Sequence, residues 1–261
     1  MDSLDPASPI ALASAVPVQR PRRIWKFWGT ALWGLVIFAG MFAGQMVVVA
    51  FFVLQKEGPL DMAAAIHVAG AGLTISLSVI TGLPGVLGAL WLATHFSRTP
   101  FADYLALRST SWRNIAIGLA ALIVLVLSWE LLSRVTGRES TPGFMMDVLK
   151  SARGDGALWL LVIAFCVAAP ISEEFLARGF LYRGWSETFL RPVGAIILSS
   201  LFWTALHMQY DWFFFCEVFS IGLLLGYLRY RYQSTWLTVI VHGLNNFAAV
   251  VQTILLVGTG S

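Results

Sequence analysis

The stretch PISEEFLAR, residues 170–178, places two adjacent carboxylates and one guanidinium inside an apolar run that extends from about 156 to 189. A transmembrane α-helix needs about 20 mostly apolar residues, and this run exceeds that length. An ionisable side chain at membrane depth costs about 2.5 to 3.5 kcal/mol on insertion scales, so such residues mark functional sites by default. The stretch therefore predicts a membrane-spanning helix that carries functional groups.

The rest of the chain has the composition of an integral membrane protein. Of its 261 residues, 58% are hydrophobic and 12% are charged, whereas a soluble domain has about 25% charged residues. The mean hydropathy is +0.77, and the formal net charge of +3 is too small to indicate a nucleic-acid partner, so we exclude nucleic acid. We predict an all-α, polytopic integral membrane protein with about seven to eight transmembrane helices.

Seven apolar runs are long enough to cross a bilayer. They lie at about 27–54, 63–94, 114–134, 156–189, 193–209, 212–230 and 235–257. The second run contains Gly82, Pro84 and Gly85, which could divide it into two helices and give eight. We also expect a short interfacial helix in the loop at 135–155.

The distribution of Lys and Arg predicts the orientation, because these residues are enriched in cytoplasmic loops. With the N-terminus inside, the seven-helix arrangement places 12 of the 17 Lys and Arg residues on the cytoplasmic side. We therefore predict a multi-pass protein of the plasma membrane, of the bacterial inner-membrane type. The predicted parts are a disordered cytoplasmic tail at 1–26, N-terminal transmembrane helices and a loop at 27–155, and a helical core at 156–257.

Helical geometry gives the two carboxylates of the PISEEFLAR stretch different surroundings. Glu174 and Arg178 are four residues apart with the acid on the N-terminal side, which is the order that favours an ion pair. Glu173 is turned by about 100° and has no such partner on its own helix, which leaves it free to act as a general base. The alternative is a structural Glu–Arg network that ties helices together.

Two further elements place polar side chains inside apolar runs. Trp203 and His207 are four residues apart, so the indole can pack on the imidazole, and His242 and Asn246 share one face of the last run. A single intramembrane histidine is more often a structural hydrogen-bonding residue than a ligand. Together, however, the three elements contain the parts of a hydrolytic site: a base, two imidazoles and an amide.

These motifs resemble those of the CPBP family of intramembrane proteases, which includes the type II CAAX prenyl endopeptidases and the abortive-infection and bacteriocin-processing proteins. The resemblance covers about residues 156–250. It rests on EExxxR, on an aromatic residue followed by xxxH, and on HxxxN, which here are Glu173, Glu174 and Arg178, then Trp203 and His207, then His242 and Asn246. The family usually has Phe where this chain has Trp203, so we expect the substitution to affect packing rather than chemistry.

The resemblance implies a hydrolase, an intramembrane endopeptidase whose catalytic bundle is formed by the last four helices. The residues that it implies as catalytic are Glu173, Glu174, Arg178, His207, His242 and Asn246. Glu173 would activate water for attack on a peptide carbonyl, and Asn246 would help to hold the oxyanion. The implied substrate is a lipidated, CAAX-like prenylated protein or another peptide taken from the lipid bilayer. From the predicted topology, we expect the site to open toward the cytoplasmic half of the membrane.

The residue set leaves two mechanisms open. Glu173, His207 and His242 form a His2Glu set of the kind that catalytic zinc accepts, so a divalent metal is one hypothesis. Without a metal, Glu173 is the base, and the imidazoles and Asn246 stabilise the tetrahedral intermediate electrostatically.

A different class of function uses the same buried polar cluster without catalysis, either for ion- or proton-coupled transport or in an immunity or scaffold role. A transporter more often has inverted repeats and paired broken helices, which are not evident in this sequence. Three other ionisable residues, Glu217, Glu130 and His67, belong to none of the motifs. Of these, Glu217 is the one that could line the same cavity.

Overall fold

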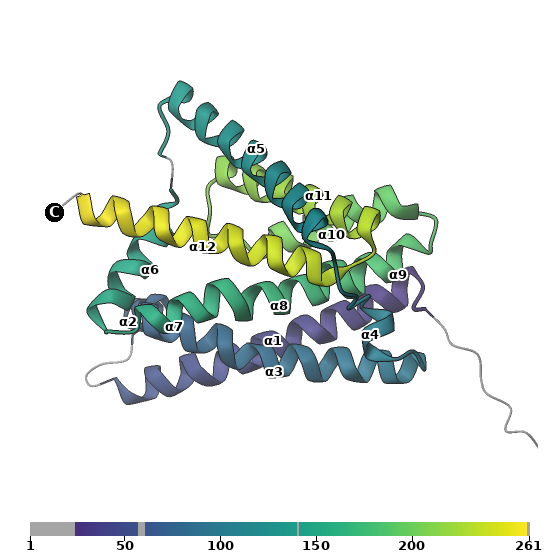
Figure 1. Cartoon of the computed structure of the whole chain (residues 1–261). Helices are drawn as coiled ribbons and strands as arrows, with labels where there is room; N and C mark the ends of the chain where they lie inside the picture. The colour runs from purple at the N-terminus through teal and green to yellow at the C-terminus, as the bar shows by residue number, and fades with distance from the viewer. Residues whose placement is uncertain (1–23, 57–60, 140, 260–261) are drawn as a thin grey trace, which may run out of the picture.

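The computed structural model describes residues 24–56, 61–139 and 141–259, and within these ranges all regular structure is helical, as predicted (Figure 1). The helices are α1 (Phe27–Gln55), α2 (Met62–Gly70), α3 (Gly72–Ser97), α4 (Phe101–Tyr104), α5 (Trp112–Thr136), α6 (Gly143–Gly154), α7 (Leu158–Ile163), α8 (Ala169–Glu174), α9 (Tyr182–Ser186), α10 (Arg191–Ala205), α11 (Trp212–Tyr232) and α12 (Thr235–Thr259). Two π-helical segments, η1 (Ala164–Ala168) and η2 (Phe175–Leu181), join α7, α8 and α9 into one continuous rod. The tail predicted at 1–26 lies, up to residue 23, outside the described residues.

Six helical stretches in the described part of the chain are long and apolar enough to cross a membrane, which confirms a polytopic all-α membrane protein. They match six of the seven predicted runs, at 27–55, 72–97, 112–136, 158–186, 212–232 and 235–257. In the remaining run, 193–209, α10 has only 15 residues. At 1.5 Å per residue it rises about 22 Å, less than the hydrocarbon core of about 30 Å. α10 is therefore not one of the stretches long enough to cross a membrane, although α11 begins at the end of the bundle opposite to the start of α10 (Figure 1).

The predicted break in the second apolar run lies at a different residue. α3 continues through Pro84, and the chain instead breaks at Ala71, whose backbone is extended (φ −65°, ψ 139°). The separated α2 has nine residues, so the break adds no spanning helix. The glycines serve close packing instead, since a Cβ at Gly85 would lie 2.1 Å from the carbonyl oxygen of Gly40 on α1. Small residues at such crossings let membrane helices approach closely, which explains the tight α1–α3 pair.

Hydrogen bonds between elements hold both ends of the bundle. Near the start of α1, the Trp25 indole donates to the carbonyl of Ala93 on α3 (3.1 Å). At the other end, the backbone N–H of Gly72 donates to the Ser151 hydroxyl of α6 (2.9 Å). α6 is the short helix that the sequence predicts in the loop at 135–155, and its buried residues lie on one face. The start of α1 and the end of α3 therefore lie together, opposite to α2 and α6 (Figure 1).

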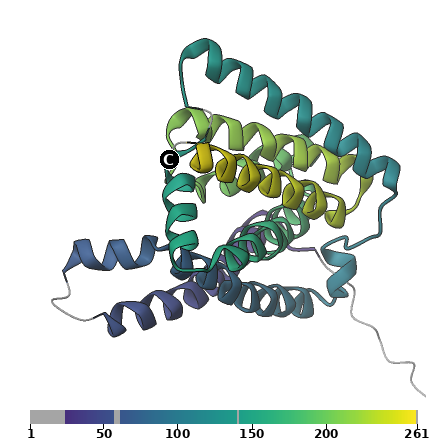
Figure 2. The ribbon, with the colours of Figure 1, turned by 60° about the vertical axis from the view of Figure 1, so that its left-hand side comes forward.

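The rod from α7 to α9 carries the PISEEFLAR stretch through the centre of the molecule. Figure 2 shows α1 and α3 on one side of this rod and α5, α11 and α12 on the other. The η2 segment is buried along its whole length. π-helical turns are rare in proteins and are frequent at functional sites. Glu173 and Glu174 thus lie between two irregular helical segments at the core of the bundle.

Candidate active site

Glu174 is the centre of a buried ion-pair cluster. Glu174 and Arg178 are both 0% exposed, and Nη1 of Arg178 donates to Oε1 of Glu174 at 2.8 Å, which is the pair that the i,i+4 spacing predicts. Nδ1 of His242, on α12, lies 3.0 Å from the same oxygen. Nη2 of Arg178 donates to the carbonyl oxygen of Gly222, on α11, at 2.9 Å. The cluster therefore ties α11 and α12 to the central rod.

The contact with Glu174 assigns the tautomer of His242. A carboxylate only accepts hydrogen bonds, so Nδ1 of His242 carries a proton, and in the neutral ring Nε2 keeps its lone pair. His242 is 3% exposed, and its side chain lines a cavity. The buried carboxylate thus orients an imidazole whose second nitrogen is an acceptor.

Glu173 has a different environment from its neighbour. Its Oε2 accepts a hydrogen bond from Nε1 of Trp203, on α10. The Trp203 ring also makes edge contacts with the rings of His207 and His242, with centroids 5.1 and 5.3 Å apart, and lies 4.6 Å from the Arg178 guanidinium carbon. The sequence predicted only the packing of Trp203 on His207. The sequence already contained the feature that allows this hydrogen bond, because the indole of Trp203 has an N–H that Phe, the usual residue at this position, lacks.

His207 and Asn246 reach the site from a turn and from the last helix. His207 follows α10, and its Nδ1 lies 3.2 Å from the carbonyl oxygen of Trp203, so this nitrogen is the donor and Nε2 the acceptor. The Asn246 amide nitrogen donates to the carbonyl oxygen of Phe165 at 2.8 Å. The side-chain oxygen of Asn246 accepts a longer bond, of 3.5 Å, from the amide of Asn245.

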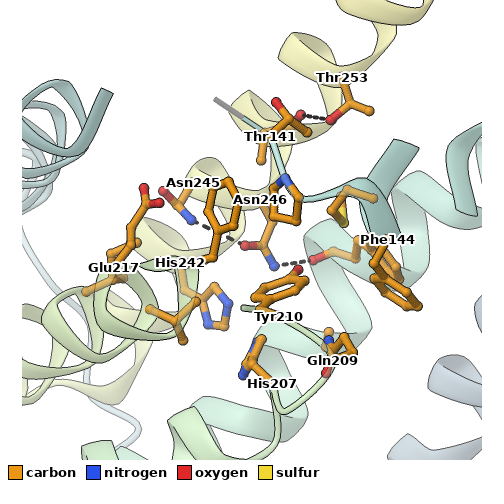
Figure 3. A pocket seen from close by; sticks show the side chains of 18 of the residues that line it. Thr141, Phe144, His207, Gln209, Tyr210, Glu217, His242, Asn245, Asn246 and Thr253 are labelled. Atoms are coloured by element: carbon orange, nitrogen blue, oxygen red, sulfur yellow. Dashed lines mark hydrogen bonds between the residues drawn. The ribbon is translucent and has the colours of Figure 1, made fainter. Parts of the chain in front are cut away.

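A cavity of about 340 Å³ brings four of the predicted residues together (Figure 3). Glu173, His207, His242 and Asn246 line it, whereas Glu174 and Arg178 lie behind its wall. Residues 155–248, which hold all of these side chains, match the family model described as Type II CAAX prenyl endopeptidase Rce1-like. This segment is similar to the Rce1-like family.

A second comparison finds a similar protein over about half of the chain. UPF0177 protein YbdI of Lactococcus lactis subsp. lactis (strain IL1403) is 30% identical over 125 residues. The aligned part is 48% of this chain and 62% of that protein, so it spans less than two thirds of the relative. No solved structure matches the chain.

The cavity of the Rce1-like segment opens away from the start of α1. It is bordered at the opposite end of the bundle by the loop residues Thr141 and Gln209 and by Phe144 in the first turn of α6. We expected the site to open toward the cytoplasmic half of the membrane, and this stays a prediction, because it depends on which end of the bundle faces the cytoplasm.

The three ionisable residues outside the motifs lie in different places. Glu217, on α11, lines the cavity together with Glu173. Glu130 pairs with Arg134 at 2.7 Å and does not line it, and His67 lies exposed on α2. Of the three, Glu217 is therefore the one that lies at the candidate site.

Tyr210 is a cavity residue that the sequence analysis missed. Its ring centroid lies 5.7 Å from that of His207, and its side chain lines the cavity (Figure 3). Burial raises the pKa of Tyr210 to about 12, and the charges of Glu173 and Glu217 act in the same direction. The phenol is therefore protonated at neutral pH and offers a hydrogen-bond donor to the site. The sequence feature that could have indicated Tyr210 as a site residue is its position three residues after His207.

A catalytic metal needs several donor side chains arranged around one point. Among the described residues, no group of three or more His, Cys, Asp or Glu side chains is arranged to hold a metal ion. Glu173, His207 and His242 line one cavity, but in this arrangement they do not form a His2Glu centre.

Proposed function

We propose that this protein is an intramembrane endopeptidase that hydrolyses a peptide bond in a lipidated, CAAX-like prenylated or membrane-embedded substrate. The observation that carries the proposal is the unequal placement of two adjacent carboxylates. Glu174 is held in a buried ion pair, whereas Glu173 lines a cavity with two histidines and Asn246. The Rce1-like match of residues 155–248 supports the assignment.

In the proposed reaction, Glu173 takes a proton from a water molecule as the water oxygen attacks the peptide carbonyl carbon. The N–H of Trp203 holds the Glu173 carboxylate in place. The second proton of this water donates a hydrogen bond to the Nε2 lone pair of His242, which orients the water, and His207 lines the cavity beside it. Glu173 then gives its proton to the leaving amine, so that a peptide and water yield a carboxylic acid and an amine.

The tetrahedral intermediate carries a negative oxygen that needs hydrogen-bond donors. Asn246 uses its amide nitrogen for one bond to the Phe165 carbonyl, which leaves a second N–H. The protonated phenol of Tyr210 is a further donor in the same cavity. A donor aimed at such an oxygen contributes about 3 to 4 kcal/mol in a site that excludes water. We assign the oxyanion to Asn246, assisted by Tyr210.

A second cavity supports an apolar or lipidated substrate. It has a volume of about 310 Å³ and borders Glu173 on the side of α1 and α3. Its other lining residues are mostly apolar: Phe38, Met41, Phe42, Gln45, Val79, Ala169, Ser172, Ala205 and Leu206. Glu173 thus lies between a cavity with polar groups and one suited to an apolar chain.

The test of the function is cleavage by purified protein in lipid vesicles. Three versions of one peptide are offered as substrates: one carries a prenyl group, one carries a transmembrane segment, and one carries neither. The protein is expected to cleave the first two, and His242→Ala is expected to lower the rate about a hundredfold or more, because the water loses an orienting group. Glu187→Gln, a change in an exposed side chain, is the control that keeps the wild-type rate.

Adding a metal chelator to the cleavage assay distinguishes the metal-free mechanism from the zinc-dependent one. The metal-free reaction that we propose keeps its rate in the presence of a chelator, whereas a zinc-dependent one loses it. A wild-type protein that cleaves none of the substrates contradicts the proposed function and favours the transport or scaffold hypothesis.

A further inference from the structure

Glu217 is the acidic residue of the cavity that the proposed reaction does not use. It lies in the second turn of α11, and its side chain lines the same cavity as Glu173 (Figure 3). Among the described residues, no side chain or backbone group forms a hydrogen bond or ion pair with its carboxylate. A carboxylate in such a place is costly unless a ligand supplies a partner.

The charges around the cavity give the sign of that partner. The described lining residues include two carboxylates, Glu173 and Glu217, and no Lys or Arg. The buried guanidinium of Arg178, behind the cavity wall, is already engaged by Glu174 and by a backbone carbonyl. Arg138 lies over the rings of Trp212 and Phe213, outside the lining. The cavity therefore has no cation of its own to balance Glu217.

The neighbouring polar groups fit a peptide side chain. Three polar side chains of α12 line the cavity: Asn245, Gln252 and Thr253. The amide of Asn245 lies beside Glu217 (Figure 3). These groups provide hydrogen bonds for a chain that enters from the loop end of the bundle. A volume of about 340 Å³ admits only a few residues, so a group that reaches Glu217 belongs to a residue close to the scissile bond.

We propose that Glu217 selects substrates with a basic side chain, Lys or Arg, close to the bond that is cleaved. This inference rests on the proposed endopeptidase function. The carboxylate of Glu217 pairs with the ammonium or guanidinium group of the substrate, while an acidic side chain at the same position is repelled. Glu217 is thus a specificity-determining residue, and Glu173 remains the base.

The test compares peptides that differ in one residue. Lys, norleucine or Glu is placed in turn at each position that flanks the cleaved bond of a membrane-embedded peptide. For wild type, the kcat/KM of the best Lys peptide is expected to exceed that of the norleucine peptide by about tenfold or more. Glu217→Gln is expected to bring the two within about twofold, and Glu217→Lys to favour the Glu peptide.

The ratio between two peptides on one variant does not depend on how much of that variant is folded. Glu187→Gln, which removes an exposed charge, is the matched control and is expected to keep the wild-type preference. Cleavage without any preference for Lys in wild type, or a preference that survives Glu217→Gln, overturns this inference and leaves the proposed function standing. Absence of cleavage of every peptide by wild type overturns both.

Discussion

At the scale of single residues, Trp203 connects the proposed base to both histidines. Its N–H donates to Glu173, and its ring contacts His207 and His242. Trp203→Phe keeps an aromatic ring but removes the donor, so Glu173 loses a charge-assisted hydrogen bond. We expect kcat/KM to fall about tenfold, with a change in unfolding free energy of about 1 kcal/mol. Peptide cleavage and thermal unfolding measure the two effects, and an unchanged kcat/KM would show that the bond does not position the base.

Glu174 and Glu173 are expected to differ in what their substitution costs. Glu174→Gln leaves the buried Arg178 guanidinium without a counter-charge, which destabilises the folded protein by about 3 kcal/mol or more. Thermal unfolding in detergent measures this loss against the control Glu187→Gln, for which no loss is expected. A Glu174→Gln protein as stable as wild type would mean that the ion pair does not hold the helices together.

The sequence predicted part of this site for a clear physical reason. The Glu174–Arg178 pair depends only on spacing within a helix, so it could be predicted from four residues of separation. The contact of Glu174 with His242 joins residues 68 positions apart. Such a contact depends on which helical faces meet, and hydropathy carries no information about that. Tyr210 was missed for the same reason, because its turn folds onto the cavity only in the assembled bundle.

At the scale of elements, the α1–α3 crossing depends on glycine. A Cβ at Gly85 would lie 2.1 Å from the backbone of Gly40, whereas Gly88 has no atom within 4 Å of its Cβ position. Gly85→Leu is therefore expected to destabilise the protein by about 2 kcal/mol or more. Gly88→Leu, on the same helix, is expected to change stability by less than about 0.5 kcal/mol. Thermal unfolding compares the two, and equal losses would contradict the close packing.

Helix lengths show how far hydropathy predicts elements. Apart from the start of α3, the apolar runs gave the bounds of the long helices within a few residues, because lipid contact requires continuous apolar surface. They did not show that α10 ends at Ala205 or that a break falls at Ala71. Both features depend on tertiary packing, since an apolar segment can continue into a turn that packs against other helices.

At the scale of the whole molecule, the predicted orientation decides the side from which the substrate enters. The test uses a protein with Cys166 and Cys216 replaced by Ala. Ser109→Cys, between α4 and α5, and Asp155→Cys, at the end of α6, then place labels at opposite ends of the bundle (Figure 1). With the N-terminus in the cytoplasm, an impermeant thiol reagent is expected to label only Asp155→Cys in intact cells. The reverse pattern would invert the orientation and put the cavity mouth on the cytoplasmic side.

The central claim is that Glu173 is the general base of peptide-bond hydrolysis. The most direct test is the cleavage rate of one lipidated membrane peptide by wild type and by Glu173→Gln, each with its unfolding temperature. Because the amide cannot accept the proton of water, the rate is expected to fall by about a hundredfold or more while the unfolding temperature changes little. A Glu173→Gln protein that cleaves the peptide at the wild-type rate would contradict the claim.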